Sequence, residues 1–142
     1  MYRHILIPTD GSELAEHGLA HGLALAKSLG AKASVIFVVE PFPEMTGRYL
    51  ETVARYAELR REQATSVLDR AANAAKEAGL SCETIQAENG QPHLAIIAAA
   101  EDKGCDLIVM SSHGRSGLSM LLIGSITNKV LTLAKTPVLV CR

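Results

Sequence analysis

The sequence predicts an α/β fold: one domain over residues 1–142, in which a doubly wound parallel sheet of five strands carries helices on both faces. Three observations predict it. A chain of 142 residues can form one compact core. Strand-like and helix-like segments alternate as βαβαβαβαβ, which implies right-handed crossovers and parallel strands. The apolar residues are mainly Ala, Leu, Ile and Val without Trp, which suits a parallel sheet packed against Ala-rich helices.

Three glycines mark the expected helix ends. Gly30, Gly79 and Gly104 each follow an Ala-rich helical pattern and precede an apolar run. Glycine at this place supplies the left-handed residue that closes a helix. We therefore expect a helix to end at each of these positions and a strand to follow.

The first strand is expected over residues 3–8, and the first helix after Gly11, with Ser12 as its N-cap. Small and apolar residues spaced by four and three predict the buried face of this helix, namely Ala15, Leu19, Gly22, Ala26 and Leu29. The second strand is expected over residues 33–39.

A long second helix is expected over residues 50–78, with a solvated charged face. Its predicted buried residues are Val53, Ala57, Ala64, Val67, Ala71 and Ala75. Residues 81–87 alternate weakly, as an edge strand does, and Pro92 is suited to begin the third helix. The last two strands are expected over residues 106–110 and 137–141.

Charge and composition exclude several partners. The formal net charge is −1 and no basic stretch stands out, so we expect no binding to nucleic acid. No apolar run approaches the ~20 residues of a membrane span, and the N-terminus has no signal-peptide organisation. Cys82, Cys105 and Cys141 have neither metal-ligand spacing nor a disulfide pattern. These features predict a cytoplasmic protein with no membrane partner.

Ligands of an open doubly wound sheet bind beyond the C-terminal ends of its strands, where the strand order reverses. The segment after the fourth strand, residues 111–125, is the most unusual of these ends. Its glycines at 114, 117 and 124 let a ligand approach the backbone, and successive N–H groups there form an anion-binding concavity. The final helix begins at Gly124-Ser125 and adds its positive end.

Side chains of this segment add to its suitability for a di- or triphosphate. Ser112 and Ser125 can donate from their hydroxyls, and Arg115 can supply a positive charge. A plain connecting loop has a similar composition, so composition alone leaves both possibilities open. The sequence contains neither G-x-G nor G-x-x-x-x-G-K-[ST], which excludes the dinucleotide fingerprint and the P-loop.

The chain resembles the universal stress protein family along nearly its whole length. The likeness lies in ILIPTDGSELA, DLIVMSSHGRSG, LLIGSITNKVL and KTPVLVCR. ATP-binding members carry G-x2-G-x9-G-[ST]; Gly114 and Gly124-Ser125 match its latter part, whereas Ser111 stands at the first glycine. The resemblance implies a Rossmann-like sheet of the adenine nucleotide alpha hydrolase type, with strand order 3-2-1-4-5. It also implies a stress-response regulator that is not an enzyme.

The resemblance places ATP or another adenine nucleotide between the first and fourth strands. Asp10 would accept hydrogen bonds from the ribose, and the backbone of Val38 would meet the adenine edge. The full set of implied binding residues is Pro8, Thr9, Asp10, Val38, Met110, Ser111, Gly114, Arg115, Gly117, Gly124, Ser125 and Ile126. Any Mg²⁺ or Mn²⁺ would be carried on the phosphates rather than in a protein cage. Asp10 could equally serve only the turn, and Val38 only the strand core.

The resemblance further implies a homodimer formed through the last strand, residues 136–142, which begins at Thr136 and ends at Arg142. An unpaired strand edge at that place invites a second copy. Nucleotide binding would then act as a switch by stabilising one conformation of the dimer.

Four alternatives remain. A dimeric interaction module that binds no ATP is favoured by Ser111. An ATP hydrolase or phosphotransferase could use His113, but no second catalytic group is visible. A receiver domain needs a carboxylate cluster, of which only Asp10 is present. His17 and His21 have a spacing that can bind metal, but no further ligand accompanies them.

Overall fold

A computed structural model describes residues 1–42, 50–113 and 122–142. The elements follow in the predicted order. They are β1 (His4–Pro8), α1 (Glu13–Leu29), β2 (Lys32–Val39), α2 (Leu50–Glu77), β3 (Cys82–Glu88), α3 (Pro92–Lys103), β4 (Leu107–Ser111), α4 (Ser125–Leu133) and β5 (Val138–Cys141). Each predicted strand end lies within one residue of the observed one.

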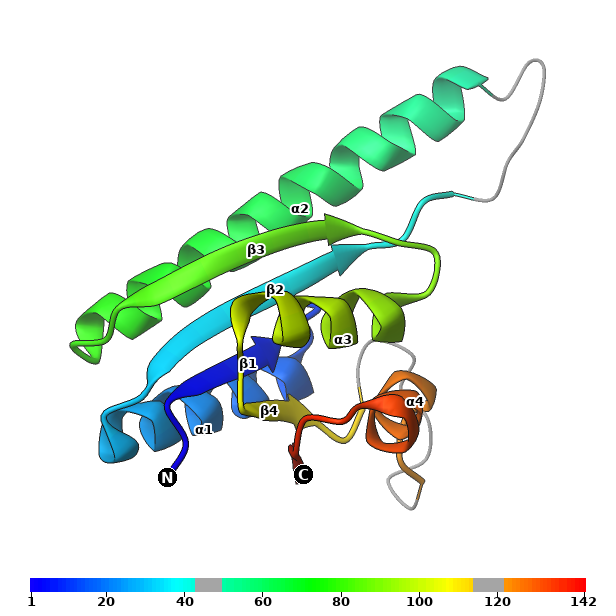
Figure 1. Cartoon of the computed structure of the whole chain (residues 1–142). Helices are drawn as coiled ribbons and strands as arrows, with labels where there is room; N and C mark the ends of the chain where they lie inside the picture. The colour runs from blue at the N-terminus through cyan, green and yellow to red at the C-terminus, as the bar shows by residue number, and fades with distance from the viewer. Residues whose placement is uncertain (43–49, 114–121) are drawn as a thin grey trace.

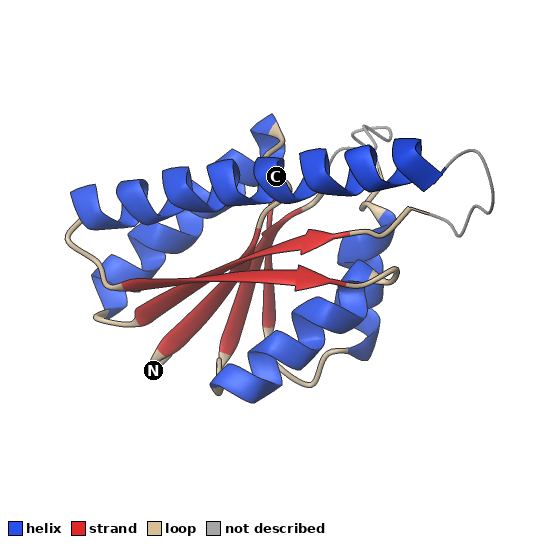
Figure 2. Cartoon of the chain, turned by 90° about the horizontal axis from the view of Figure 1, so that it is seen from above, coloured by secondary structure: helices blue, strands red, loops and turns tan. Residues whose placement is uncertain are grey.

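The five strands pair in parallel in the order β3-β2-β1-β4-β5, which confirms the predicted doubly wound α/β fold. Helices α1 and α2 cover one face of this sheet and α3 and α4 the other (Figure 1 and Figure 2). Strands β2 and β3 are added on one side of β1, and β4 and β5 on the other. The strand order therefore reverses between β1 and β4. The edges of the described sheet are β3, as predicted, and β5.

Two apolar clusters fill the space between the sheet and its helices. Successive strand residues point to opposite faces, so Ile7 of β1 packs under α1 and α2 while Leu6 packs under α3 and α4. Both side chains are fully buried. The central strands are apolar on both faces, as expected for a parallel sheet between two helical layers.

The glycines predicted to close helices do so. Gly30, Gly79 and Gly104 have φ angles of 65°, 77° and 67°, in the left-handed region. At the start of α1, the Ser12 side chain accepts a hydrogen bond from the N–H of Ala15 at 3.2 Å, which confirms the predicted N-cap.

The predicted buried face of α1 is wrong at Leu29, whose side chain is 40% exposed. Leu29 is the last helical residue, and no atom lies within 4 Å of the point where a Cβ on the adjacent Gly30 would stand. At this terminal position the side chain is left in solvent, while Ala26 and Ala31 on either side of it are buried in the core. Gly18 and Leu23 are buried instead, between the correctly predicted positions.

The predicted buried face of α2 is confirmed at Ala64, Val67, Ala71 and Ala75 and is wrong at Val53 and Ala57, which are only half-buried. The first half of α2 extends past the ends of the strands, so that no sheet lies beneath it (Figure 1). We call residues 50–63 of α2 the α2 extension.

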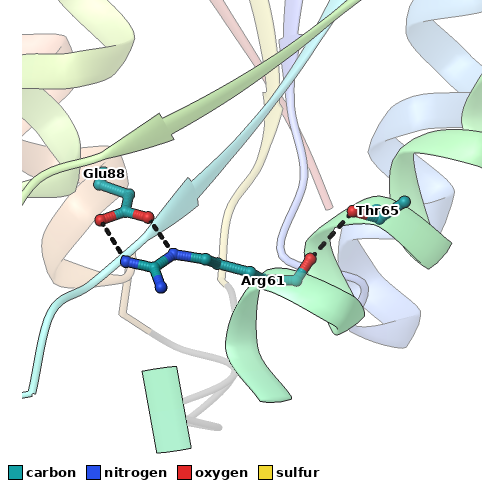
Figure 3. A network of polar contacts seen from close by, with 3 residues as sticks. All are labelled: Arg61, Thr65 and Glu88. Carbon is teal, nitrogen blue, oxygen red and sulfur yellow. Dashed lines mark hydrogen bonds and ion pairs between the residues drawn. The ribbon is translucent and has the colours of Figure 1, made fainter. Parts of the chain in front are cut away.

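One ion pair fastens the α2 extension to the end of β3 (Figure 3). The Nε of Arg61 donates to Oε1 of Glu88 at 2.5 Å, and a terminal nitrogen of the same guanidinium donates to Oε2 at 3.3 Å. Thr65 donates to the carbonyl of Arg61 at 3.1 Å, one turn further along the helix. The pair raises the pKa of Arg61 and lowers that of Glu88, mainly through their hydrogen bond.

Candidate functional site

A cleft of about 420 Å³ opens at the C-terminal ends of β1, β2 and β4. It lies where the strand order reverses, and its volume is typical of a small-molecule site. The described residues that line it are Pro8, Thr9, Asp10, Ala15, Ile36, Val38, Glu40, Arg60, Gly90, Gln91, Pro92, His93, Ile96, Met110, Ser111, His113, Gly124, Ser125, Ile126, Thr127 and Lys129.

The end of β1 turns into α1 beside the cleft. The N–H of Thr9 donates to the carbonyl of Ile36 at 2.9 Å, which extends the pairing of β1 with β2 by one residue. The N–H of Ser12 donates to Oδ1 of Asp10 at 2.9 Å. This Asx turn starts α1 and holds the half-buried carboxylate of Asp10 at the mouth of the cleft. The turn role and the cleft position of Asp10 therefore coexist.

Ser111, at the position of the first motif glycine, is the last residue of β4 and is buried. Its hydroxyl donates to the carbonyl of His113 at 2.7 Å. A Cβ on Gly18 of α1 would lie 3.1 Å from the N of Ser111 and 3.4 Å from its Cβ. The missing side chain at Gly18 thus provides the room that a side chain at 111 requires.

Ser112 joins the end of β4 to two other elements. Its N–H donates to the carbonyl of Cys141 in β5, and its carbonyl accepts from the N–H of Gly124, both at 2.7 Å. A Cβ on Gly124 would lie only 3.1 Å from that carbonyl oxygen. Glycine at 124 therefore allows the start of α4 to approach the end of β4 closely.

The N-terminus of α4 lines the cleft, and its N-cap residue, Gly124, has no side chain with which to cap it. Its first intrahelical hydrogen bond runs from the N–H of Asn128 to the carbonyl of Gly124 at 2.9 Å. The N–H groups of residues 125–127 therefore have no intrahelical acceptor, and the helix dipole adds positive potential. The exposed Lys129 stands on the same side of α4, at the rim of the cleft. This end of the cleft suits an anion.

Sequence reasoning missed several lining residues. His93 and Ile96 come from the first turns of α3, and His93 is buried to all but 6%. Arg60 reaches the cleft from the α2 extension, donates to Gln63 at 2.6 Å, and stands 5.6 Å from the ring centre of Phe37. The Pro-His pair after the third strand was a usable signal for His93. No sequence signal indicated Arg60, because it lies within a long helix and not at the end of a strand, where binding residues are expected.

Nine of the predicted binding residues line the cleft: Pro8, Thr9, Asp10, Val38, Met110, Ser111, Gly124, Ser125 and Ile126. Gly114, Arg115 and Gly117 fall outside the described residues. His17 and His21 are exposed on α1, and within the described ranges no three His, Cys, Asp or Glu residues form a metal-binding group. The described helices include none that is long and apolar enough to cross a membrane.

Comparison with known proteins gives consistent matches over the full length. The model of the universal stress protein family matches residues 1–142. Universal stress protein YxiE of Bacillus subtilis is 34% identical over 149 aligned residues, which cover 100% of both chains. The solved structure of universal stress protein UspA from Lactobacillus plantarum has a TM-score of 0.89 at 22% identity and covers 99% of this chain and 98% of that one.

Two further structures of similar fold were solved with nucleotides. One is a universal stress protein in complex with cAMP, with a TM-score of 0.75, 23% identity and coverage of 99% of this chain and 97% of that one. The other is the universal stress protein from Archaeoglobus fulgidus in complex with dAMP, with a TM-score of 0.74, 20% identity and coverage of 99% and 98%.

Proposed function

Because the chain belongs to the universal stress protein family, we propose that it is a stress-response regulator that binds ATP or another adenine nucleotide in this cleft. The observation that carries the proposal is the meeting of Asp10, at the end of β1, with the uncapped N-terminus of α4 in one cleft at the strand reversal. Two proteins of similar fold hold adenine nucleotides, which supports the choice of base.

The phosphates fit the α4 end of the cleft. The N–H groups of residues 125–127, which have no acceptor within the helix, and the positive end of the helix dipole attract an anion. The Ser125 hydroxyl and the Lys129 ammonium group add a donor and a charge at the same end. A divalent cation, when present, is carried by the phosphates, and its chemistry there is charge neutralisation.

The nucleoside fits the remainder of the cleft. A carboxylate accepts several hydrogen bonds at once, so Asp10 can hold both the N–H of Ser12 and the ribose hydroxyls. Ile36, Val38 and Ile96 supply an apolar wall for a base. The backbone of Val38 is the group we assign to the adenine edge.

Isothermal titration calorimetry with ATP, ADP, AMP and GTP tests the proposal. We expect the three adenine nucleotides to bind and GTP to bind more weakly. Asp10→Asn keeps an oxygen for the Asx turn but removes the charge, and we expect it to weaken binding without unfolding the protein. Absence of binding by every adenine nucleotide at millimolar concentration would contradict the proposal and favour an interaction module that needs no nucleotide.

We further propose that the protein is a homodimer paired through β5, within residues 136–142. The carbonyls of Pro137 and Cys141 accept hydrogen bonds from Ile108 of β4, at 2.9 Å, and from Ser112 just after it, at 2.7 Å. Backbone groups alternate in direction along a strand, so those of Val138 and Val140 point to the free edge. Such an edge forms a template for a second copy. Leu131 and Leu133 of the preceding helix are also exposed, by 40% and 54%.

Sedimentation velocity tests the dimer. Val140→Pro removes an edge N–H but no hydrogen bond to β4, and proline is tolerated on edge strands with that orientation. We expect the wild type to sediment as a dimer and Val140→Pro as a folded monomer. A wild-type monomer at micromolar concentration would contradict the proposal.

A further inference from the structure

The His113 side chain is a buried group with one ring nitrogen unused. The residue is only 6% exposed and lines the cleft. Its Nδ1 lies 3.0 Å from the hydroxyl oxygen of Ser112. Its Nε2 is shielded from solvent and has no hydrogen-bond partner among the described residues. A buried polar atom without a partner is unusual in a folded protein and calls for a physical explanation.

The Ser112 contact leaves two arrangements for the imidazole proton. Within the described part of the chain, the Ser112 hydroxyl has no other hydrogen-bond partner than Nδ1. If the hydroxyl donates to Nδ1, its hydrogen is satisfied and the imidazole proton lies on Nε2. If Nδ1 donated instead, the buried hydroxyl hydrogen would have no acceptor. Each arrangement leaves one buried donor without a partner among the described residues, Nε2–H in the first and the Ser112 hydroxyl in the second. Of these two residues only His113 lines the cleft, so the first arrangement leaves the free donor where a ligand can satisfy it.

This donor lies next to the uncapped start of α4. The ring atom Cδ2, which is bonded to Nε2, lies 3.8 Å from the point where a Cβ on Gly124 would stand. The Cα of His113 lies 3.4 Å from that same point. Gly124 immediately precedes the helix whose first N–H groups have no intrahelical acceptor. The His113 ring and the N-terminus of α4 therefore lie together at one end of the cleft.

We propose that His113 is a positioning residue for the phosphates, and that its Nε2–H donates to a phosphate oxygen held at the N-terminus of α4. The inference rests on the proposed function and adds to it a residue that makes binding depend on the phosphates. With the Ser112 hydroxyl donating to Nδ1, the donor is present before the ligand arrives, and because it is shielded from solvent the ligand reaches it through a local shift of the ring or its surroundings. The site thereby favours phosphorylated adenosines over adenosine itself.

The first test needs no ligand. A long-range ¹H–¹⁵N correlation spectrum of the ¹⁵N-labelled protein at pH 8 reports which ring nitrogen of each histidine carries the proton. The signals of His113 are identified by their loss in His113→Asn. We expect the Nε2–H tautomer. Observation of the Nδ1–H tautomer would overturn the inference whatever the protein binds.

The second test compares ADP with adenosine as probes. His113→Gln places an amide N–H near the position of Nε2, whereas His113→Asn reaches only as far as Nδ1. We expect His113→Asn to weaken ADP binding about tenfold, the effect of one hydrogen bond to a charged oxygen, and His113→Gln to retain most of the affinity. Adenosine, titrated by NMR, should bind all three proteins equally. His17→Ala, which removes an exposed imidazole from α1, should change nothing.

The outcomes separate this inference from the proposed function. If the wild type binds ADP and His113→Asn binds it equally well, the inference is wrong and the proposed function stands. If His113→Asn weakens adenosine as much as ADP, the role of His113 is structural and the inference is wrong. If the wild type binds neither probe, the proposed function itself fails.

Discussion

At the scale of single residues, glycines in α1 set the distance between that helix and the sheet. A Cβ on Gly22 would lie 2.6 Å from Cδ1 and 2.8 Å from Cγ1 of Ile7, and 3.5 Å from the Cβ of Val109. Ile7 is fully buried, so it has little room to move aside. Small residues at this face allow α1 to pack directly on β1 and β4.

Gly22→Ala should therefore destabilise the protein although alanine favours helices. Overpacking costs about 1–3 kcal/mol, and the gain in helix propensity offsets about 1 kcal/mol of it. We expect the free energy of unfolding in urea to fall by about 1 kcal/mol. His21→Ala, at an exposed position of the same helix, should not reduce it. A Gly22→Ala variant as stable as the wild type would show that the interface relaxes freely.

Cys105 should be the least reactive of the three thiols. Burial, together with the negative charges of Asp106 and Glu83, raises its pKa to about 11. At pH 8 only about one part in a thousand is thiolate, the form that reacts. In mass spectrometry after iodoacetamide treatment of the native protein, we expect Cys82 and Cys141 to be alkylated before Cys105. The denatured protein should lose this order, and equal native rates would contradict the prediction.

At the scale of elements, the two halves of α2 have different support. The residues of α2 that are buried, Ala64, Val67, Leu68, Ala71 and Ala75, all follow the α2 extension. Local opening is easier where few apolar contacts exist. We expect amide hydrogens of residues 50–63 to exchange faster than those of residues 64–77, as measured by mass spectrometry on overlapping peptides. Uniform protection would mean that another surface covers the extension.

The side chain of Asp106 joins the starts of β4 and β1. Its carboxylate accepts from the N–H groups of Arg3, at 2.9 Å, and His4, at 3.0 Å. Burial alone would raise its pKa, but these backbone hydrogen bonds outweigh it, and the pKa lies below its ordinary value of 3.8. A carboxyl group with a lowered native pKa stabilises the fold above its unfolded pKa, and this stability is lost as the pH falls through the native pKa.

Asp106→Asn should reveal this contribution. At pH 7 we expect the variant to be less stable by roughly 1 kcal/mol, since an amide oxygen accepts more weakly than a carboxylate. The difference from the wild type should shrink as the pH falls below about 4, where the carboxylate of the unfolded chain becomes protonated. Urea unfolding at several pH values measures it. A difference that does not change with pH would assign the effect to packing instead.

The sequence was sufficient for the elements because their signals are local. Gly30 and Gly104 close helices by backbone conformation, whatever lies around them. Periodicity also showed which residues of a helix share a face. It could not show how far the opposing sheet extends, which is why Val53 was assigned to the core wrongly. Strand ends predicted much of the cleft, but Arg60 enters it from a helix whose placement depends on tertiary packing.

At the scale of the whole molecule, the cleft is lined by elements from both helical layers. Ala15 and Arg60 come from α1 and α2, and Ile96 and Thr127 from α3 and α4. A ligand held by both layers stabilises the whole folded state. At a concentration of ADP a hundredfold above its dissociation constant, we expect about 2.7 kcal/mol of added stability and a rise in Tm of about 5–10 °C. Differential scanning calorimetry measures it, and an unchanged Tm would contradict binding in this cleft.

The backbone of Ser112 is hydrogen-bonded both to Gly124, at the start of α4, and to Cys141, the last residue of β5. A single residue therefore links the proposed nucleotide site to the proposed dimer edge. Thermodynamic linkage then imposes reciprocity: a nucleotide that tightens pairing at β5 by some factor must itself bind the dimer more tightly than the monomer by that factor. Nucleotide affinity should therefore depend on protein concentration around the dimer dissociation constant. In Val140→Pro, which we expect to stay monomeric, nucleotide affinity should not depend on protein concentration, because no dimerisation is left to couple to nucleotide binding.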